Sequence, residues 1–220
     1  PRSGTTLLEQ VLDGHPKIIS AEETMILTTD AWQPLTRGYK EDSSALDILE
    51  VATDEDLHQS IQNYFANTEK YLGEPVGGRL LLDKNPAMNP FLPAVARIFP
   101  EAKIIVAVRD PRDVCLSCFM QPLGVNPVSC AYLTLADTAA QYASVMGFWK
   151  ALQPIFKNPS LEIRYEELVD DLESVARRTL NFLEVGWDER VLSFNENARN
   201  KIIRSPTYAD VSKPVFKTAI

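Results

Sequence analysis

The chain has 220 residues, of which 45% are hydrophobic and 24% are charged, and its formal net charge at pH 7 is -8. Proteins that bind nucleic acids or anionic membranes normally display a basic face, so this charge argues against both classes of partner. No apolar run approaches the roughly 20 residues that span a bilayer, and the first residues do not resemble a secretory signal. We therefore expect one domain over residues 1–220 that does not insert into a membrane.

The first helix is expected over residues 5–14, where leucine and valine recur at helical spacing and Gly14 ends the pattern. A short strand follows at residues 17–20, with the sequence KIIS. The polar and aromatic region 22–71 is expected to form mobile helices and loops. Such regions often carry substrate contacts.

Three further strands are expected, at residues 79–84, 103–110 and 161–164. The first two are apolar runs that end in charged residues, which is typical of buried parallel strands. Later helices are expected at residues 172–183 and 189–199. This alternation predicts an α/β fold with a mostly parallel central sheet flanked by helices on both faces. In such folds, ligands bind beyond the carboxyl ends of the strands.

The opening loop, PRSGTT, leads directly into the first expected helix. The free amides and the dipole of a helix N-terminus favour an anion, and Ser3, Thr5 and Thr6 add hydroxyl donors, so a phosphate or sulfate fits there. Because Gly4 is followed by Thr5, the lysine of an ATP-binding loop is missing and ATP hydrolysis is disfavoured. The alternative is an ordinary Ser/Thr helix cap.

A second charged strand end occurs in VRDPRDVCLS. Arg109 ends the strand, Pro111 is placed to begin a helix, and Ser117 lies two turns into that helix. Arg109 and Ser117 together could hold a second phosphate. The alternative is a surface ion pair between Arg109 or Arg112 and the neighbouring aspartates.

The three cysteines, Cys115, Cys118 and Cys130, cannot form a closed disulfide framework, which favours an intracellular protein. Cys115 and Cys118 form a C-x-x-C motif, but no second cysteine pair completes a zinc site. We interpret them as small buried helix residues and expect no metal site.

These motifs resemble the PAPS-dependent sulfotransferases, particularly the tyrosylprotein sulfotransferases and the bacterial sulfotransferase domains attached to tetratricopeptide repeats. The resemblance implies a three-layer, P-loop-like α/β fold. In this family a P-[RK]-S-G-T-T loop binds the 5′-phosphosulfate of the donor, and a later arginine and serine bind its 3′-phosphate. The corresponding residues of this chain are Arg2, Ser3, Gly4, Thr5, Thr6, Arg109 and Ser117.

The resemblance also implies catalytic residues. LDGHPKIISAEET is similar to a family stretch that ends in G-E-E-T, with Ala21 in place of the glycine, and implies that Glu23 is the general base. DKNP implies a catalytic lysine at Lys84, and IRSPTYADVSKPV a catalytic serine at Ser205. IRYEELV implies that Tyr165 contacts the adenine. Arg2 would join the lysine and serine in stabilising the transferring group.

Each of these assignments has a structural alternative. Glu22 and Glu23 could be an acidic surface pair, Lys84 a solvated charge at a strand end, and Ser205 a turn residue. His15 is a second candidate base, but it lies at the far end of the first helix, about 15 Å from the end where the phosphates should bind.

The implied reaction moves a sulfuryl group from PAPS to an acceptor hydroxyl by in-line transfer, with PAP as the product and without a metal. The acceptor is left open between a protein tyrosine, a sugar and a small molecule, and its choice is expected to depend on residues 32–71. The alternatives are a degenerate P-loop small-molecule kinase and a non-catalytic nucleotide-binding domain.

The resemblance runs over residues 1–215 except 32–76. It implies that the chain lacks the family's first strand and its C-terminal closing segment. It favours a cytoplasmic, bacterial-type domain, with the Golgi lumen as the alternative for a membrane-anchored enzyme, and it leaves a homodimer open.

Overall fold

The computed structural model describes residues 1–40, 43–121 and 129–194. The chain divides into two compact units that alternate along the sequence. Unit 1 contains Pro1–His15, Ile104–Phe156 and Ser160–Ile220, and unit 2 contains Pro16–Lys103 and Lys157–Pro159. The expectation of a single domain over residues 1–220 stays a prediction.

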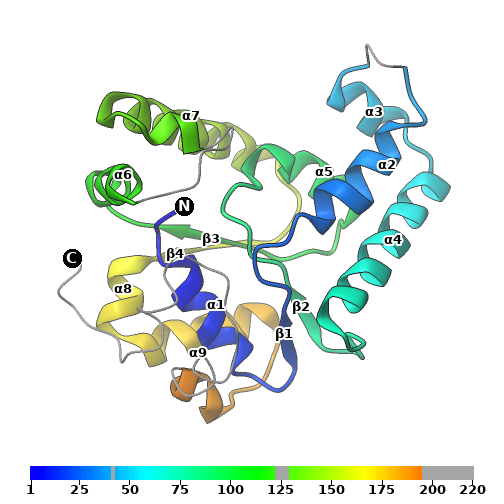
Figure 1. Ribbon diagram of the computed structural model, residues 1–220. Helices are drawn as coiled ribbons and strands as arrows, with labels where there is room; N and C mark the ends of the chain where they lie inside the picture. Colours follow the sequence, from blue (N-terminus) through cyan, green and yellow to red (C-terminus); the bar gives the residue numbers. More distant parts are fainter. Residues whose placement is uncertain (41–42, 122–128, 195–220) are drawn as a thin grey trace. The chain divides into compact units, whose positions relative to one another are not determined.

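Unit 1 is built on a parallel strand pair, in which Val106 of β3 lies opposite Glu162 of β4. In Figure 1, α6 and α7 lie on one side of this pair, and α1, α8 and α9 lie on the other. Its elements are α1 (Thr5–Asp13), β3 (Ile104–Val108), α6 (Pro111–Met120), η3 (Ser129–Tyr132), α7 (Leu135–Leu152), η4 (Gln153–Ile155), β4 (Ser160–Arg164), α8 (Tyr165–Asp170), α9 (Leu172–Leu183) and η5 (Glu189–Ser193).

Local sequence explains where the helices of unit 1 begin and end. Pro111 begins α6, and the Asp110 side chain accepts a hydrogen bond from the backbone N–H of Arg112 at 2.9 Å. Asp171 caps α9 in the same way, through the backbone N–H of Ser174. The helix predicted at residues 172–183 is confirmed. Of the helix predicted at residues 189–199, the described part forms the 3₁₀ segment η5, and the remainder lies outside the described residues.

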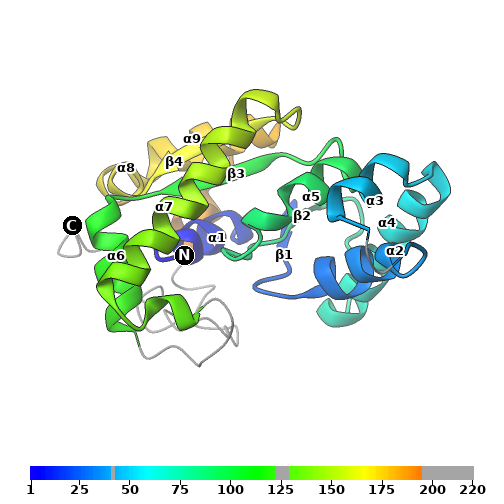
Figure 2. The same cartoon turned by 90° about the horizontal axis from the view of Figure 1, so that it is seen from above.

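Unit 2 has its own parallel pair, in which Ile19 of β1 lies opposite Leu81 of β2. Helices make up most of the unit, as Figures 1 and 2 show. Its elements are β1 (Ile18–Ser20), η1 (Leu27–Trp32), α2 (Gln33–Thr36), α3 (Ala45–Val51), α4 (Asp54–Leu72), β2 (Leu80–Leu82), η2 (Asn89–Phe91) and α5 (Leu92–Ile98).

The α/β fold class predicted from the sequence is confirmed, with two corrections of detail. The described strands form two separate parallel pairs, β1–β2 and β3–β4. The apolar run of β3 is only partly buried along its whole length, whereas the sequence predicted a fully buried strand. The carboxyl ends of β1, β2, β3 and β4 lead to the predicted site residues Glu23, Lys84, Arg109 and Tyr165.

Candidate functional site

The opening loop has a backbone that depends on glycine. Gly4 has φ of 80° and precedes α1, and Arg2 also has positive φ, at 60°. A Cβ atom at Gly4 would lie 2.5 Å from the Tyr165 ring, so no other residue fits without displacing that ring. In the described structure no side chain caps α1 by a hydrogen bond, so the helix-cap alternative for this loop is wrong. Thr5 and Thr6 lie in the first turn of α1, where backbone N–H groups point out of the helix.

Arg2 joins the opening loop to α6. Its Nε donates a hydrogen bond to Ser117 Oγ at 2.9 Å, although the two residues are 115 positions apart. Ser3 is buried beside Arg2, and its hydroxyl donates to the Pro1 carbonyl at 3.4 Å. The two motifs that the sequence assigned to phosphate binding are therefore adjacent within unit 1.

Arg109 packs between the opening loop, α6 and α8. Its Nη1 donates to the Arg2 carbonyl at 3.4 Å, and its Nη2 lies 3.5 Å from the Asp113 carboxylate. Its guanidinium carbon lies 4.4 Å from the centre of the Tyr165 ring, a cation–π geometry. The Arg109 side chain is 14% exposed, so its pairing with Asp113 is not a surface ion pair.

The surface ion pair instead involves Arg112. This side chain is 89% exposed and pairs with Asp110 at 2.7 Å. The hydrogen bonds from Arg112 hold the pKa of Asp110 well below its usual range. We use the name arginine cluster for the group that lies together here, Arg2, Gly4, Arg109, Ser117 and Tyr165.

Glu23 and Lys84 form an ion pair within unit 2, in which Lys84 Nζ donates to Glu23 Oε1. The Lys84 side chain is 9% exposed and that of Glu23 is 40% exposed. The alternative of a solvated strand-end charge is therefore wrong for Lys84. Glu23 is an exposed acidic residue, as the surface-pair alternative expects, and its carboxylate pairs with Lys84.

Backbone hydrogen bonds between the two chain segments continue beyond the ends of β1 and β2 and determine where Glu23 and Lys84 lie. The Ala21 N–H donates to the Leu82 carbonyl at 2.9 Å, and the Lys84 N–H donates to the Glu22 carbonyl at 3.3 Å. Glu22 has φ of 56°, and its N–H is held by Ser20 Oγ at 3.0 Å. The ends of β1 and β2 thus bring the Glu23 carboxylate and the Lys84 ammonium group together. In this arrangement the carboxylate could accept a proton beside a fixed positive charge.

Four other residues that the sequence singled out have simple outcomes. His15 is buried, with its ring nitrogen 2.9 Å from the Gly186 carbonyl oxygen, at the opposite end of α1 from the opening loop. Cys118 is a buried free thiol whose pKa is raised by burial, and Cys115 is a partly buried one, as expected of small helix residues. Ser205 lies outside the described residues.

Sequence reasoning missed a contact next to Lys84. Tyr64 of α4 donates a hydrogen bond from its hydroxyl to Asp83 Oδ2 at 2.8 Å. The two residues are 19 positions apart. Asp83 belongs to the DKNP motif, but Tyr64 belongs to no motif that the sequence marks.

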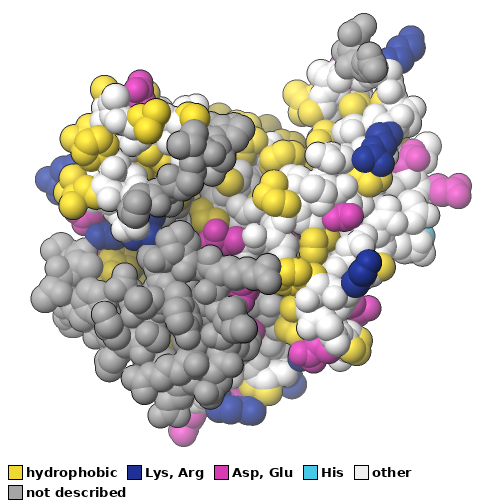
Figure 3. Space-filling view, viewed as in Figure 1, with side chains coloured by type: hydrophobic (Ala, Val, Ile, Leu, Met, Phe, Trp, Pro, Cys, Tyr) yellow, Lys and Arg dark blue, Asp and Glu magenta, His cyan; other side chains and the backbone are white. Residues whose placement is uncertain are grey.

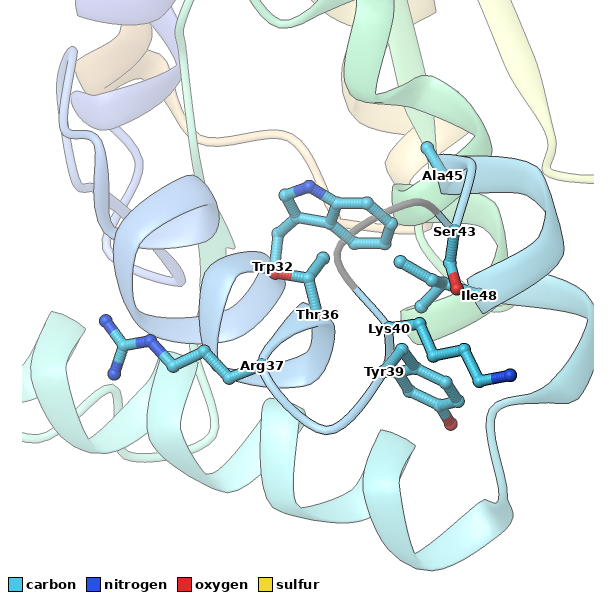
Figure 4. A pocket seen from close by; sticks show the side chains of 8 residues that line it. All are labelled: Trp32, Thr36, Arg37, Tyr39, Lys40, Ser43, Ala45 and Ile48. Carbon is cyan, nitrogen blue, oxygen red and sulfur yellow. The ribbon is translucent and has the colours of Figure 1, made fainter.

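The region that the family resemblance left unmatched contains a cavity. It has a volume of about 520 Å³, a size typical of small-molecule sites. Figure 4 shows the Trp32 indole near Thr36, while the charged ends of Arg37 and Lys40 point away from it. The lining residues are Trp32, Thr36, Arg37, Tyr39, Lys40, Ser43, Ala45 and Ile48.

Exposed hydrophobic side chains gather over α6 and α7, as Figure 3 shows. They include Leu116, Phe119, Met120, Leu135 and Phe148. Several such residues on adjacent helices make an apolar surface rather than isolated exposed positions. In the described part of the chain, no helix is both long and apolar enough to span a membrane.

Residues 1–189 match the sulfotransferase family. The chain belongs to this family. Protein-tyrosine sulfotransferase 1 of Danio rerio is 30% identical over 205 residues, covering 89% of this chain and 54% of that protein. An uncharacterised protein of Aquifex aeolicus is 26% identical over 230 residues, covering 100% of this chain and 29% of that protein. The chain thus spans about half the length of these relatives or less.

Two solved sulfotransferase structures share the fold. The sulfotransferase domain from the curacin biosynthetic pathway has a TM-score of 0.52 and 21% identity, covering 88% of this chain and 74% of that domain. The domain from the Synechococcus PCC 7002 olefin synthase has a TM-score of 0.53 and 22% identity, covering 99% and 86%. The predicted family resemblance is confirmed.

Proposed function

We propose that this sulfotransferase-family chain transfers a sulfuryl group from PAPS to an acceptor hydroxyl. The observation that carries the proposal is the hydrogen bond between Arg2 and Ser117, which joins the opening loop to α6 within unit 1. A donor with both a 5′-phosphosulfate and a 3′-phosphate needs two anion sites that are close together. The arginine cluster supplies cations, a hydroxyl and an aromatic ring to such a ligand.

In the proposed complex, the first turn of α1 and the opening loop bind the 5′-phosphosulfate, through Arg2, Ser3, Gly4, Thr5 and Thr6. Arg109 and Ser117 bind the 3′-phosphate. Ser117 accepts a hydrogen bond from Arg2 and keeps its own hydroxyl proton to donate to the ligand. The Tyr165 ring, which already stacks with Arg109, offers a face to the adenine.

In the proposed transfer step, Glu23 takes the proton of the acceptor hydroxyl while the acceptor oxygen attacks sulfur. A new S–O bond forms to the acceptor, and the S–O bond to the 5′-phosphate breaks, with the electron pair leaving on the phosphate oxygen of PAP. Lys84 and Arg2 stabilise the negative charge that develops in this step, and Ser205 is proposed to assist them.

The acceptor is proposed to carry an aromatic or apolar group next to its hydroxyl. A protein tyrosine is one such acceptor, and several relatives are named as protein-tyrosine sulfotransferases.

A screen of acceptor classes tests the proposed function. The chain is incubated with PAPS and, in separate reactions, a tyrosine peptide, a sugar and a small phenol, and the products are examined by mass spectrometry. We expect sulfated product together with PAP in at least one reaction. Donor binding without any product would favour a non-catalytic nucleotide-binding domain, whereas Mg²⁺-dependent phosphoryl transfer from ATP would favour a kinase.

A further inference from the structure

The buried hydroxyl of Tyr64 is bound directly beside the proposed catalytic lysine. Tyr64 is 6% exposed and projects from α4 to the end of β2, where its hydroxyl donates to Asp83 Oδ2 at 2.8 Å. Asp83 directly precedes Lys84 in the chain. The hydrogen bond therefore fixes the backbone at the position where the Lys84 side chain departs.

Tyr64 also belongs to a core cluster that involves both chain segments carrying the Glu23–Lys84 pair. The cluster includes Ile26 and Leu27, which follow Glu23 by three and four residues. Leu81 of β2, three residues before Lys84, packs against the same cluster. The ring of Phe99 lies edge-on to Tyr64, with the ring centres 5.0 Å apart. The cluster that contains Tyr64 thus links the segment after Glu23 with the strand before Lys84.

In the hydrogen bond between Tyr64 and Asp83, the Tyr64 hydroxyl is the donor. Burial and the neighbouring Asp83 carboxylate raise the pKa of Tyr64, so its hydroxyl stays protonated and donates. Burial raises the pKa of Asp83, while the hydrogen bond from Tyr64 acts in the opposite direction and favours the ionised carboxylate. Without the Tyr64 hydroxyl, the poorly solvated Asp83 carboxyl group would lose this hydrogen-bond donor. The end of β2 would then have to rearrange.

We propose that Tyr64 is a positioning residue for sulfuryl transfer, which through Asp83 holds Lys84 in register with Glu23. The inference rests on the proposed function of that pair. It assigns a role to a residue within positions 32–76, where the sequence showed no counterpart in the family. Tyr64 does not touch the reacting atoms in this proposal and acts through the end of β2.

Tyr64→Phe tests the proposal because it keeps the ring and removes only the hydroxyl. We expect kcat for transfer from PAPS to a tyrosine peptide to fall about tenfold, the factor that corresponds to one lost buried hydrogen bond at the transfer step. The dissociation constant for PAP should stay unchanged, because the arginine cluster belongs to unit 1.

Ser60→Ala is the matched control. Ser60 is a buried residue of the same helix, and its hydroxyl donates to the Asp56 carbonyl at 3.0 Å, away from β2. The control should lower the melting temperature by a similar amount and leave kcat per folded molecule unchanged. A double variant, Tyr64→Phe with Asp83→Ala, should be no slower than Tyr64→Phe alone, since the two changes remove the donor and the acceptor of one hydrogen bond.

A second measurement separates failure of this inference from failure of the proposed function. Lys84 is labelled by brief acetylation with acetic anhydride and quantified by mass spectrometry. In Tyr64→Phe, a released Lys84 should react several-fold faster than in wild type, and in Ser60→Ala it should react at the wild-type rate. A chain that sulfates nothing would contradict the proposed function and still allow this labelling test. Equal labelling of Tyr64→Phe and wild type would overturn the positioning role.

Discussion

At the scale of single residues, Glu23 can be tested with a variant that keeps its shape. Glu23→Gln retains a hydrogen-bonding side chain beside Lys84 and cannot accept a proton. We expect single-turnover transfer to slow by roughly 10²–10⁴, the usual contribution of a general base. Affinity for PAP, measured by calorimetry, should stay at the wild-type value, because the proposed donor contacts belong to other residues.

His15→Ala provides the contrast. His15 is buried and its ring contacts the Gly186 carbonyl oxygen, so the variant should lose stability while activity per folded molecule stays nearly unchanged. A folded, donor-binding but inactive His15→Ala beside an active Glu23→Gln would reverse the assignment of the base.

Arg109 carries the second residue-scale prediction. Arg109→Ala removes a largely buried guanidinium from the arginine cluster, so PAP should lose most of its advantage over AMP, which lacks the 3′-phosphate. A charge-assisted contact to phosphate is commonly worth about 1.5–3 kcal/mol. Calorimetric titration of both nucleotides measures this difference.

Arg112→Ala is the control for Arg109→Ala. Arg112 is three residues away, and its exposed side chain pairs with Asp110, so PAP should keep its preference in that variant. Equal affinity of wild type for PAP and AMP would rule out Arg109 and Ser117 as the 3′-phosphate site.

Part of the candidate site could be predicted from the sequence, because some of its residues stand at strand ends. Lys84 and Arg109 stand where apolar runs stop, and this pattern marks the ligand-facing edge of a parallel sheet. Asp83 stands at the same strand end, but its partner Tyr64 could not be found in this way, because their contact joins a helix to a strand end 19 residues later. The hydrogen bond between Arg2 and Ser117 spans 115 positions, and no local pattern encodes it.

At the scale of elements, the connection between β2 and α4 predicts a pH dependence of stability. Burial raises the pKa of Asp83 in the folded chain above its unfolded value. The carboxyl therefore contributes stability that is fully present below the unfolded pKa, and this stability is lost as the pH rises through the folded pKa. Asp83→Asn lacks this titration, so its melting temperature relative to wild type should increase as the pH rises from about 4.

Thermal unfolding of wild type and Asp83→Asn at several pH values measures the effect. Asp47→Asn is a suitable control, because Asp47 is the exposed partner of Ser44 in the capping box of α3, away from α4 and β2. A difference between Asp83→Asn and wild type that does not change with pH would contradict the burial of this carboxyl.

Some helices and strands could be predicted from the sequence, and others could not. All four strands and α1 lie where the sequence placed them, because β-branched runs and helical leucine spacing are local signals. Residues 22–71 were expected to contain helices and loops, but the sequence did not predict where the helices begin; α3 and α4 begin at capping boxes at Ser44 and Thr53. In both boxes the reciprocal residue is aspartate, Asp47 or Asp56, rather than the usual glutamate or glutamine. The polar composition of the segment concealed these helix starts.

At the scale of the whole molecule, the proposed anionic donor would have to be held in an acidic chain by a few placed cations. The net charge of -8 gives no long-range attraction for PAPS. Arg2 and Arg109 are placed by backbone and side-chain contacts in unit 1, and Lys84 is placed by the β1–β2 pair in unit 2. Donor binding is therefore expected to depend on these locally positioned cations and not on the net charge of the chain.

These placed cations lead to the last prediction, that transfer does not require a divalent metal. A transferring sulfuryl group carries less negative charge than a terminal phosphoryl group, so the roles proposed for Arg2, Lys84 and the amides of α1 would suffice for transfer without a metal. Turnover with PAPS should stay at the wild-type rate after dialysis against EDTA, and added Mg²⁺ should not increase it. The same preparation should show no transfer from ATP. Complete loss of activity in EDTA, with recovery on addition of Mg²⁺, would instead support a phosphoryl-transfer enzyme, because a terminal phosphate without the loop lysine needs a metal to neutralise its charge.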